Sequence, residues 1–395
     1  MILAAGFGTR VRPLTETLPK PMVPIINKPV MEFLVDLLRR HGFDQIIVST
    51  AYLANEIESY FGDGSLFGVQ IAYSFEGYHE GGEVRTAGLG SAGALRAVQD
   101  FSGFYDDTFV VLCGDAIIDL DLTRAVAIHR ERKALATVLL QEVPREHVGR
   151  YGVVETDADD RILQFQEKPR PEEAISTVAN TGIYVFDPQV FDHIPSGRWY
   201  DICCDLFPRL IEEGRPLYGL RLPFNWIDIG RTSDYWDAIQ AILRGSVGGI
   251  EPPGRLLAPG VRAGICVDVR LDACQVEGPL YIGACTRIEP GATIVGPTVV
   301  GRNCVIEAGA RIEACIVGPY TRVSGFANLK EKIVSGRFCV DRSGHNVDLA
   351  RTGYAFVVDD ARERRDWTED QKILIDFLES ARNEVPMAEG WGGGR

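Results

Sequence analysis

The chain has 395 residues, of which 46% are hydrophobic and 24% charged, a composition typical of a globular protein with two or three domains. Its net charge of −14 and the lack of a basic stripe argue against a nucleic-acid partner. No apolar run approaches the ~20 residues of a membrane span, and no signal peptide is evident, so we expect no membrane partner. The nine cysteines lack Cys-x-x-Cys spacing, which favours reduced thiols and a cytoplasmic location.

The N-terminal stretch combines a short strand, a glycine-containing loop and several cations. Residues 1–5 are an apolar run that predicts a buried parallel strand. Gly6 and Gly8 follow, and such a loop can bring backbone N–H groups against a phosphate. The first 28 residues have a local charge of +3 in an acidic chain, which predicts a small polyanionic ligand. The acid is Glu16, and the cations are Arg10, Arg12, Lys20 and Lys28.

Two common phosphate-binding motifs do not fit this loop. A Walker loop and a dinucleotide fingerprint both need glycine at position 11, which is Val11. A Gly-x-Gly alone would be an ordinary turn between a strand and a helix. Pro19 and Pro21, however, fix the backbone on both sides of Lys20, so this lysine is positioned rather than simply solvated.

The run from Leu3 to Pro24 closely resembles the signature of the sugar-1-phosphate nucleotidyltransferases, G-x-G-T-R followed by P-K-P. The resemblance covers about the first 245 residues, and because family members usually carry a few residues before this strand, the start could lie upstream of Met1. It implies that Arg10 and Lys20 contact the nucleotide phosphates and stabilise the transition state. It also implies that the residues binding the nucleotide in this loop are Ala4, Ala5, Gly6, Gly8 and Thr9.

Strands and helices alternate after this loop. The patterns predict helices near 29–41, 54–61, 122–132 and 232–243, and strands near 45–50, 69–74 and 108–113. They predict a Rossmann-like α/β domain, with helices on both faces of a mostly parallel sheet and ligands at the carboxyl ends of its strands. By resemblance this is a GT-A-like catalytic domain over residues 1–245.

A second glycine-rich segment runs from Gly88 to Leu95. Ser91 can cap a helix that continues to about Gln99, and taken alone the segment would be a turn before an amphipathic helix. In context it resembles the family's L-G-T-A-G segment, which holds the base and ribose. This resemblance implies that the nucleotide is also bound by Gly90, Ser91, Ala92 and Gly93. The preceding insert, residues 77–87, is longer than usual, and the sequence leaves open whether it is a lid.

Two aspartates are candidate metal ligands. Asp115 ends an apolar strand in a Gly-Asp pair, and Asp228 lies in a run similar to the family's W-x-D-x-G motif. Each could instead cap a following helix. We assign a capping or surface-charge role to Asp119 and Asp121, and the metal role to Asp115 and Asp228. The resemblance, in which a G-D motif also supplies a metal ligand, implies that both aspartates hold the metal. Mg²⁺ prefers oxygen ligands and often takes one or two carboxylates plus phosphates, so it is the expected cofactor.

The segment from about 134 to 186 is expected to shape a sugar pocket. Gly152 lies in a strand-like stretch where a ring could approach. A Glu-Lys-Pro run resembles a family motif in which Glu167 would bind sugar hydroxyls and Lys168 the sugar phosphate. Alone, it would be an exposed strand end. Asn180 begins N-T-G-I-Y, which resembles the strand that floors the sugar site.

The pattern changes after a Gly- and Pro-rich linker at 246–259. Aliphatic residues recur every six positions, which predicts a short left-handed parallel β-helix over 260–345, with about three coils at 276–334. The repeat comprises Ile282, Ile288, Ile294, Val300, Ile306 and Ile312. In the extension, 346–395, we expect one amphipathic helix, from about 368 to 381, and a disordered end.

The resemblance to the sugar-1-phosphate nucleotidyltransferases implies nucleotidyl transfer from an NTP to a sugar-1-phosphate. Overall resemblance is greatest to the cyanobacterial-type UDP-glucose pyrophosphorylases, which predicts UTP and glucose-1-phosphate as substrates. Mannose-1-phosphate guanylyltransferases share the motifs and the β-helix, so GTP with mannose-1-phosphate is an alternative. A non-catalytic paralogue that binds nucleotide sugar should have lost a site residue, and the candidate catalytic and metal residues are all present.

The β-helix could itself carry an acyltransferase activity. That activity usually needs a histidine in the coils, and none occurs between His193 and His345. We therefore expect an oligomerisation or regulatory module, and a homo-oligomer, because so short a solenoid leaves its end coils exposed.

Overall fold

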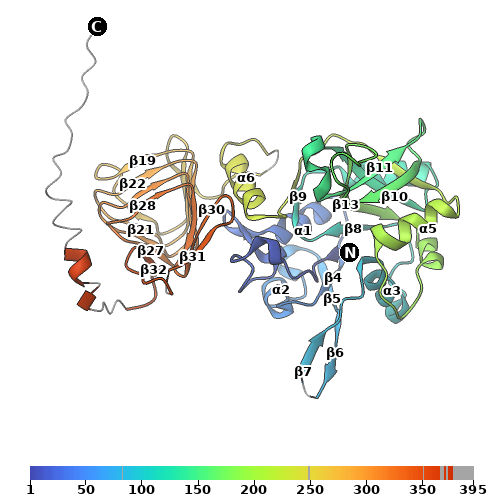
Figure 1. Ribbon diagram of the computed structural model, residues 1–395, viewed down its shortest axis with the longest axis horizontal. Helices are drawn as coiled ribbons and strands as arrows, with labels where there is room; N and C mark the ends of the chain where they lie inside the picture. Colours follow the sequence, from blue (N-terminus) through green and yellow to red (C-terminus); the bar gives the residue numbers. More distant parts are fainter. Residues whose placement is uncertain (82, 248–249, 350, 365–368, 371, 377–395) are drawn as a thin grey trace, which may run out of the picture. The chain divides into compact units, whose positions relative to one another are not determined.

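The computed structural model describes residues 1–81, 83–247, 250–349, 351–364, 369–370 and 372–376 (Figure 1). It divides into two compact units, Met1–Gly230 and Arg231–Arg395. The division precedes helix α6 (Thr232–Leu243), which contacts strand β23 (Thr298–Val300) of the second unit. The side chain of Gln240 on α6 donates a hydrogen bond to the carbonyl of Pro297 at 3.1 Å. The second unit therefore begins earlier in the chain than residue 245.

The first unit is built on one nine-stranded sheet. Its strands are β1 (Ile2–Leu3), β4 (Gln45–Thr50), β5 (Gln70–Phe75), β8 (Phe109–Cys113), β10 (Ala136–Glu142), β11 (Gly152–Thr156), β12 (Ile162–Glu167), β13 (Val178–Phe186) and β14 (Leu217–Leu220). The order is β12-β11-β13-β8-β1-β4-β5, with β10 paired to β13 and β14. Strands β8, β1, β4 and β5 are parallel, as predicted, whereas β13 is antiparallel to β8, β10 and β11. The sheet is therefore mixed.

Helices cover both faces of this sheet, which confirms the predicted layers. One core takes its residues from α1 (Val30–Arg40), α2 (Ala54–Phe61) and α4 (Leu122–Glu131), for example Leu34, Ile57 and Ala125. The other core takes Leu95 from α3 (Ser91–Ser102) and Leu210 from α5 (Phe207–Glu212). The helices predicted from periodicity are confirmed to within one or two residues at each end.

The insert at residues 77–87 forms a hairpin of β6 (Gly77–Glu80) and β7 (Glu83–Thr86), which projects from the end of β5 (Figure 1). Arg85 Nε lies 3.0 Å from the carboxylate of Glu80. The strands close tightly at Gly77, where a Cβ would lie 2.4 Å from the carbonyl oxygen of Arg85.

The second unit contains a parallel β-helix whose strands stack into three sheets. The first sheet stacks β17 (Val261–Ala263), β20 (Leu280–Ile282), β23, β26 (Ile316–Val317) and β29 (Lys332–Ser335). The second stacks β18 (Asp268–Val269), β21 (Arg287–Ile288), β24 (Val305–Ile306) and β27 (Thr321–Val323), and the third stacks β19 (Gln275–Glu277), β22 (Thr293–Val295), β25 (Arg311–Glu313) and β28 (Asn328–Lys330). Four coils are complete: the three predicted within 276–334 are confirmed, and one more, β17 to β19, precedes them.

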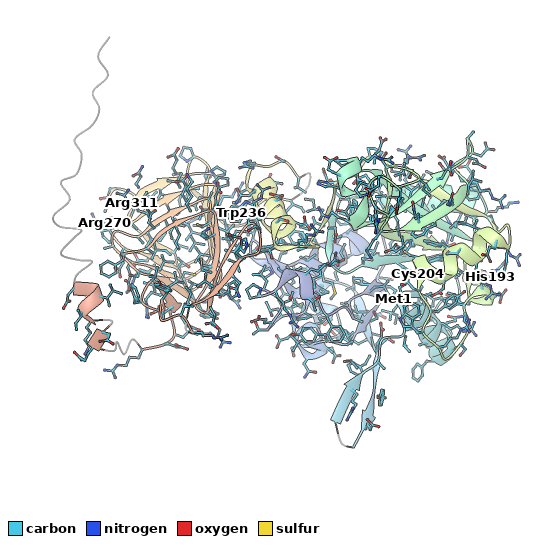
Figure 2. The ribbon with its side chains drawn as sticks, viewed as in Figure 1. Met1, His193, Cys204, Trp236, Arg270 and Arg311 are labelled. Atoms are coloured by element: carbon cyan, nitrogen blue, oxygen red, sulfur yellow. The ribbon has the colours of Figure 1, made fainter. Side chains whose placement is uncertain are left out.

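The hexad residues fill the β-helix interior, as predicted. Ile282 to Ile312, at six-residue steps, are at most 3% exposed, and small residues such as Thr286 and Ala292 lie buried between them. Charged side chains such as Arg270 and Arg311 stand on the outer surface of the coils (Figure 2). The first coil was missed because Val269 and Val276 are seven residues apart, which interrupts the period of six.

Both flanks of the β-helix contain more structure than the sequence predicted. Strand β16 (Arg255–Ala258), within the predicted linker, pairs with β17. In the predicted extension, β31 (Asn346–Asp348) pairs with β30 (Phe338–Asp341), and β32 (Val358–Asp360) pairs with β27. Residues 369–370 and 372–376 are helical. The rest of the predicted tail helix and the predicted disordered end lie outside the described residues.

Candidate active site

The first glycine loop leaves the carboxyl end of β1 and enters a helical turn at Thr9–Val11. Gly8 has φ +62°, and a Cβ there would lie 3.0 Å from Cβ of Lys20. Its carbonyl accepts hydrogen bonds from the Thr15 hydroxyl at 2.8 Å and from the Val11 amide at 3.1 Å. Gly8 is therefore required for the loop to pack against Lys20, whereas Gly6 is exposed and has open space around it.

Lys20 lies at the centre of the candidate site. It begins a helical turn after Pro19 and is only 8% exposed. Its ammonium donates a hydrogen bond to Asp115 Oδ2 and lies 3.8 Å from Asp228 Oδ1. Burial disfavours the charged ammonium, but the two carboxylates outweigh it and raise the pKa of Lys20. Lys20 is therefore a protonated cation at neutral pH.

Strand pairing brings the two aspartates together. Asp115 lies between β8 and β9 (Ala116–Ile118), and β9 pairs antiparallel with β15 (Trp226–Asp228), so that Asp228 faces Ala116. The amide of Ile229 donates to the carbonyl of Asp115 at 3.0 Å. By contrast, Asp121 caps α4 by accepting from the Arg124 amide at 2.9 Å, which confirms its predicted role.

The paired carboxylates fit a divalent cation. They already surround one positive charge, the Lys20 ammonium, and they offer only oxygen donors. Among the described residues no group of three or more His, Cys, Asp or Glu side chains could hold a metal ion. Further ligands would thus have to come from a bound phosphate or from water.

The predicted sugar-phosphate residues meet at the start of β11 and the end of β12. Gly152 pairs with Glu167, and a Cβ on Gly152 would lie 2.4 Å from the Phe165 ring and 2.8 Å from Glu167 Oε2. The ring that approaches this glycine is therefore the protein's own. Lys168 Nζ donates to Glu167 Oε1 at 2.6 Å, and this hydrogen bond raises the pKa of Lys168.

Arg10 is exposed, and its positive charge acts on both Lys20 and Lys168. These three cations therefore surround one region at the carboxyl ends of the parallel strands, which is where anionic ligands were expected.

Asn180 lies in β13 with only 8% exposure. Its Nδ2 donates to the hydroxyl of Tyr184 at 3.0 Å and to Sγ of Cys203 at 3.2 Å, and its Oδ1 accepts from the Gly182 amide at 2.9 Å. Burial raises the pKa of the Cys203 thiol, so this sulfur is a neutral hydrogen-bonding group. Its neighbour Cys204 is exposed (Figure 2).

In the second glycine segment, Ser91 does not cap α3, so that prediction was wrong. Gly90 is the N-cap residue, with φ +74°, and a Cβ there would lie 2.5 Å from the carbonyl oxygen of Tyr200. The amides of Ala92 and Gly93 donate to that same carbonyl at 3.0 and 2.8 Å. Ala4 likewise uses its amide within the fold, donating to the Ser49 carbonyl at 3.1 Å. These three amides are therefore already engaged.

Sequence reasoning missed the segment that meets this glycine loop. Tyr200, Asp201 and Cys203 join residues 89–93 to Asn180 through hydrogen bonds. The one available signal was an aspartate followed by Ile-Cys-Cys, where Asp201 accepts from the amides of Cys203 and Cys204 at the start of a helical turn.

The fold brings Lys20, Asp115 and Asp228 together at the carboxyl edge of the parallel strands of an α/β sheet. The family model described as nucleotidyl transferase matches residues 1–245, and the bacterial transferase hexapeptide model, with six repeats, matches residues 279–314. The chain belongs to the nucleotidyl transferase family, with an added left-handed β-helix of the hexapeptide type.

Two curated relatives and one solved structure are similar to this chain. The chain is 53% identical, over 92% of its length and 93% of the relative's, to a UTP–glucose-1-phosphate uridylyltransferase from Synechocystis sp.. It is 33% identical to a mannose-1-phosphate guanylyltransferase from Mycobacterium tuberculosis, over 82% of this chain and 80% of that protein. A solved UDP-glucose pyrophosphorylase complexed with UDP-glucose matches 62% of this chain and 97% of its own, with a TM-score of 0.52 and 22% identity, which supports the fold alone.

Proposed function

We propose that the chain converts UTP and glucose-1-phosphate into UDP-glucose and pyrophosphate. The single observation that carries nucleotidyl transfer is the convergence of Lys20, Asp115 and Asp228 at the end of the first glycine loop. The choice of base and sugar is supported by the 53% identity to a uridylyltransferase over 92% of the chain.

In the proposed reaction a phosphate oxygen of the sugar-1-phosphate attacks the α-phosphorus of the NTP. A new P–O bond forms, the bond to the β-phosphate breaks, and its electron pair leaves with pyrophosphate. The protein positions the reactants and neutralises charge. Arg10 and Lys20 would contact the nucleotide phosphates, Lys168 would hold the nucleophile's phosphate, and Glu167 would bind sugar hydroxyls.

We propose Mg²⁺ as the cofactor, held by Asp115 and Asp228 together with phosphate oxygens. When bound, it would neutralise charge on the NTP phosphates. Lys20 donates to Oδ2 of Asp115, an oxygen that the metal would also need, so the lysine has to share or release this carboxylate when the ion binds.

The test is a matrix of NTPs against sugar-1-phosphates with pyrophosphate detection. We expect kcat/KM for UTP with glucose-1-phosphate to exceed that for GTP with mannose-1-phosphate, the alternative that the 33% identical relative suggests. A higher value for the GTP and mannose pair would reverse the assignment. No turnover with any pair would favour a nucleotide-sugar-binding paralogue.

We also propose a homo-oligomer built through the β-helix, and a cytoplasmic location. All nine cysteines are free thiols, which suits a reducing compartment. Among the described residues, no helix combines the length and apolarity needed to cross a membrane.

A further inference from the structure

One short segment, residues 198–206, joins the loop proposed to hold the nucleotide to the strand proposed to floor the sugar site. On the loop side its contacts are made by the backbone of Tyr200. The Tyr200 amide donates to the carbonyl of Leu89 at 2.9 Å, and its carbonyl accepts the amides of Ala92 and Gly93 at 3.0 and 2.8 Å. Tyr200 is 8% exposed, so these bonds are shielded from water.

The carboxylate of Asp201 then connects two elements that are far apart in the chain. Its Oδ2 accepts a hydrogen bond from the hydroxyl of Ser91, the first residue of α3, at 2.8 Å. Its Oδ1 accepts the amides of Cys203 and Cys204 at 2.8 and 2.9 Å, which caps the helical turn Ile202–Leu206. The Ser91 oxygen in turn accepts the Ile202 amide at 2.8 Å. One side chain thus fixes the start of both elements.

Cys203 extends this network to the sugar side. Its sulfur accepts from Asn180 Nδ2 at 3.2 Å and lies 3.5 Å from the hydroxyl of Tyr184. The position of Asn180 therefore depends on where the Asp201-capped turn holds Cys203.

We propose that Asp201 is a positioning residue that couples the two substrate sites. A nucleotide that orders residues 90–93 fixes Ser91 and so Asp201, and Asp201 holds Cys203 against Asn180. This inference rests on the proposed function, because it needs a nucleotide at the loop and a sugar phosphate near Asn180. Asp201 itself is assigned to neither site.

The test compares full-length wild type with Asp201→Asn. This variant keeps an oxygen acceptor for the Cys203 and Cys204 amides, but an amide nitrogen replaces Oδ2, the oxygen that accepts the Ser91 hydroxyl. Initial rates are measured with UTP and glucose-1-phosphate both varied. In the wild type, saturating UTP should lower KM for glucose-1-phosphate by roughly 5-fold, a typical coupling between two sites. In Asp201→Asn this dependence should fall below about 2-fold, and KM should rise for both substrates.

Ser91→Ala provides a second variant, since it removes only the loop end of the network, and it should lose the same coupling. The matched control is Ser102→Ala at the other end of α3, whose hydroxyl donates to the Val98 carbonyl at 2.8 Å. The control should keep wild-type coupling. Circular dichroism melting separates folding defects from changes in KM.

The proposal is overturned if Asp201→Asn keeps the wild-type coupling, if it raises KM for UTP alone, or if it only lowers the melting temperature. A failure of the proposed function is distinguishable, because it appears in the wild type as preference for another pair. The coupling is then measured with the pair that the wild type turns over.

Discussion

Lys20 donates a hydrogen bond from its ammonium to the carboxylate of Asp115, although the two residues are 95 positions apart in the chain. The same ammonium lies 3.8 Å from Asp228. A buried cation between two acids offsets their mutual repulsion, and it also competes with a metal ion for the same oxygens. This relationship leads to separate expectations for catalysis and for metal binding.

We expect Lys20→Ala and Asp115→Asn each to lower kcat/KM by roughly 10²–10³, the scale for losing one contact to transition-state charge. The affinity for Mn²⁺, measured by electron paramagnetic resonance without substrates, should change in opposite directions in Lys20→Ala and Asp228→Asn. Lys20→Ala should bind Mn²⁺ about 10-fold more tightly, because its competing ammonium is gone, and Asp228→Asn should bind it about 10-fold more weakly.

Asp121→Asn is the control for these variants, since asparagine also caps helices and Asp121 caps α4. It should keep wild-type activity and metal affinity. If Lys20→Ala and Asp228→Asn both bind Mn²⁺ as the wild type does, the two carboxylates are not the metal site.

Two glycines flank α3 with positive φ, and they allow a matched comparison. Gly90 has φ +74°, and a Cβ there would lie 2.5 Å from the carbonyl oxygen of Tyr200. Gly103 has φ +63°, and a Cβ there would point into open space. Gly103→Ala should cost only about 1 kcal/mol of stability. Gly90→Ala should cost about 2–3 kcal/mol and also raise KM for the NTP, because the loop must move away from Tyr200. Melting curves and KM values measure both effects, and equal costs for the two variants would contradict the close approach at Gly90.

Sequence patterns predicted the elements that depend on local periodicity. Strand β4 and helix α2 have the predicted bounds, and the six-residue repeat placed Ile282 to Ile312 inside the β-helix. Strand direction is not encoded in that periodicity, so the antiparallel run of β13 beside β8 was not foreseen.

The candidate site was predictable where residues form contiguous motifs, as at Lys20. Contacts across long stretches of chain were not predictable in this way. Ser91 was expected to cap its own helix, but its hydroxyl bonds Asp201, which lies 110 residues later. Nothing in the spacing of either residue indicates that pairing, because it arises from how the sheet brings two loops together.

His129 makes the stability of the first unit depend on pH. It is 2% exposed, and its Nδ1 lies 2.9 Å from the hydroxyl of Thr137. Burial lowers the pKa of His129 to about 4, with Asp187 opposing and Arg130 adding to that shift. An unfolded histidine has a pKa of about 6.5, so between pH 6.5 and 4 the unfolded chain takes up a proton that the folded chain does not. Stability should therefore fall as the pH drops through this window.

From pH 7.5 to 5.0 this loss should be about 2 kcal/mol in the free energy of unfolding. Urea titrations at both pH values measure it. His129→Gln should lose that share of the pH dependence, while His147→Gln, at an exposed position, should keep it. Identical pH dependence in the wild type and His129→Gln would show that His129 is not responsible.

The start of the β-helix exposes apolar side chains that an assembly would cover. Leu256 and Ile265 are 64% and 76% exposed, at the first strand and in the first coil. If subunits pack through this end, replacing both residues with glutamate places charges in a dry interface and should reduce the subunit number. Val347→Glu is the matched control, because Val347 is an apolar residue, 41% exposed, on β31. Light scattering at matched concentration gives the subunit number of each protein.

A shortened chain without the β-helix is a second test of the same assembly. Every predicted site residue lies before Gly230, so a chain that ends there should retain measurable nucleotidyl transfer and form a smaller species. This end point is preferable to Arg244, because α6 contacts β23 and would otherwise lose its partner. The glutamate variant should keep kcat within about 2-fold, since its changes lie outside the site. If the full-length chain is a monomer, or if the shortened chain has the same subunit number, the β-helix does not build the assembly.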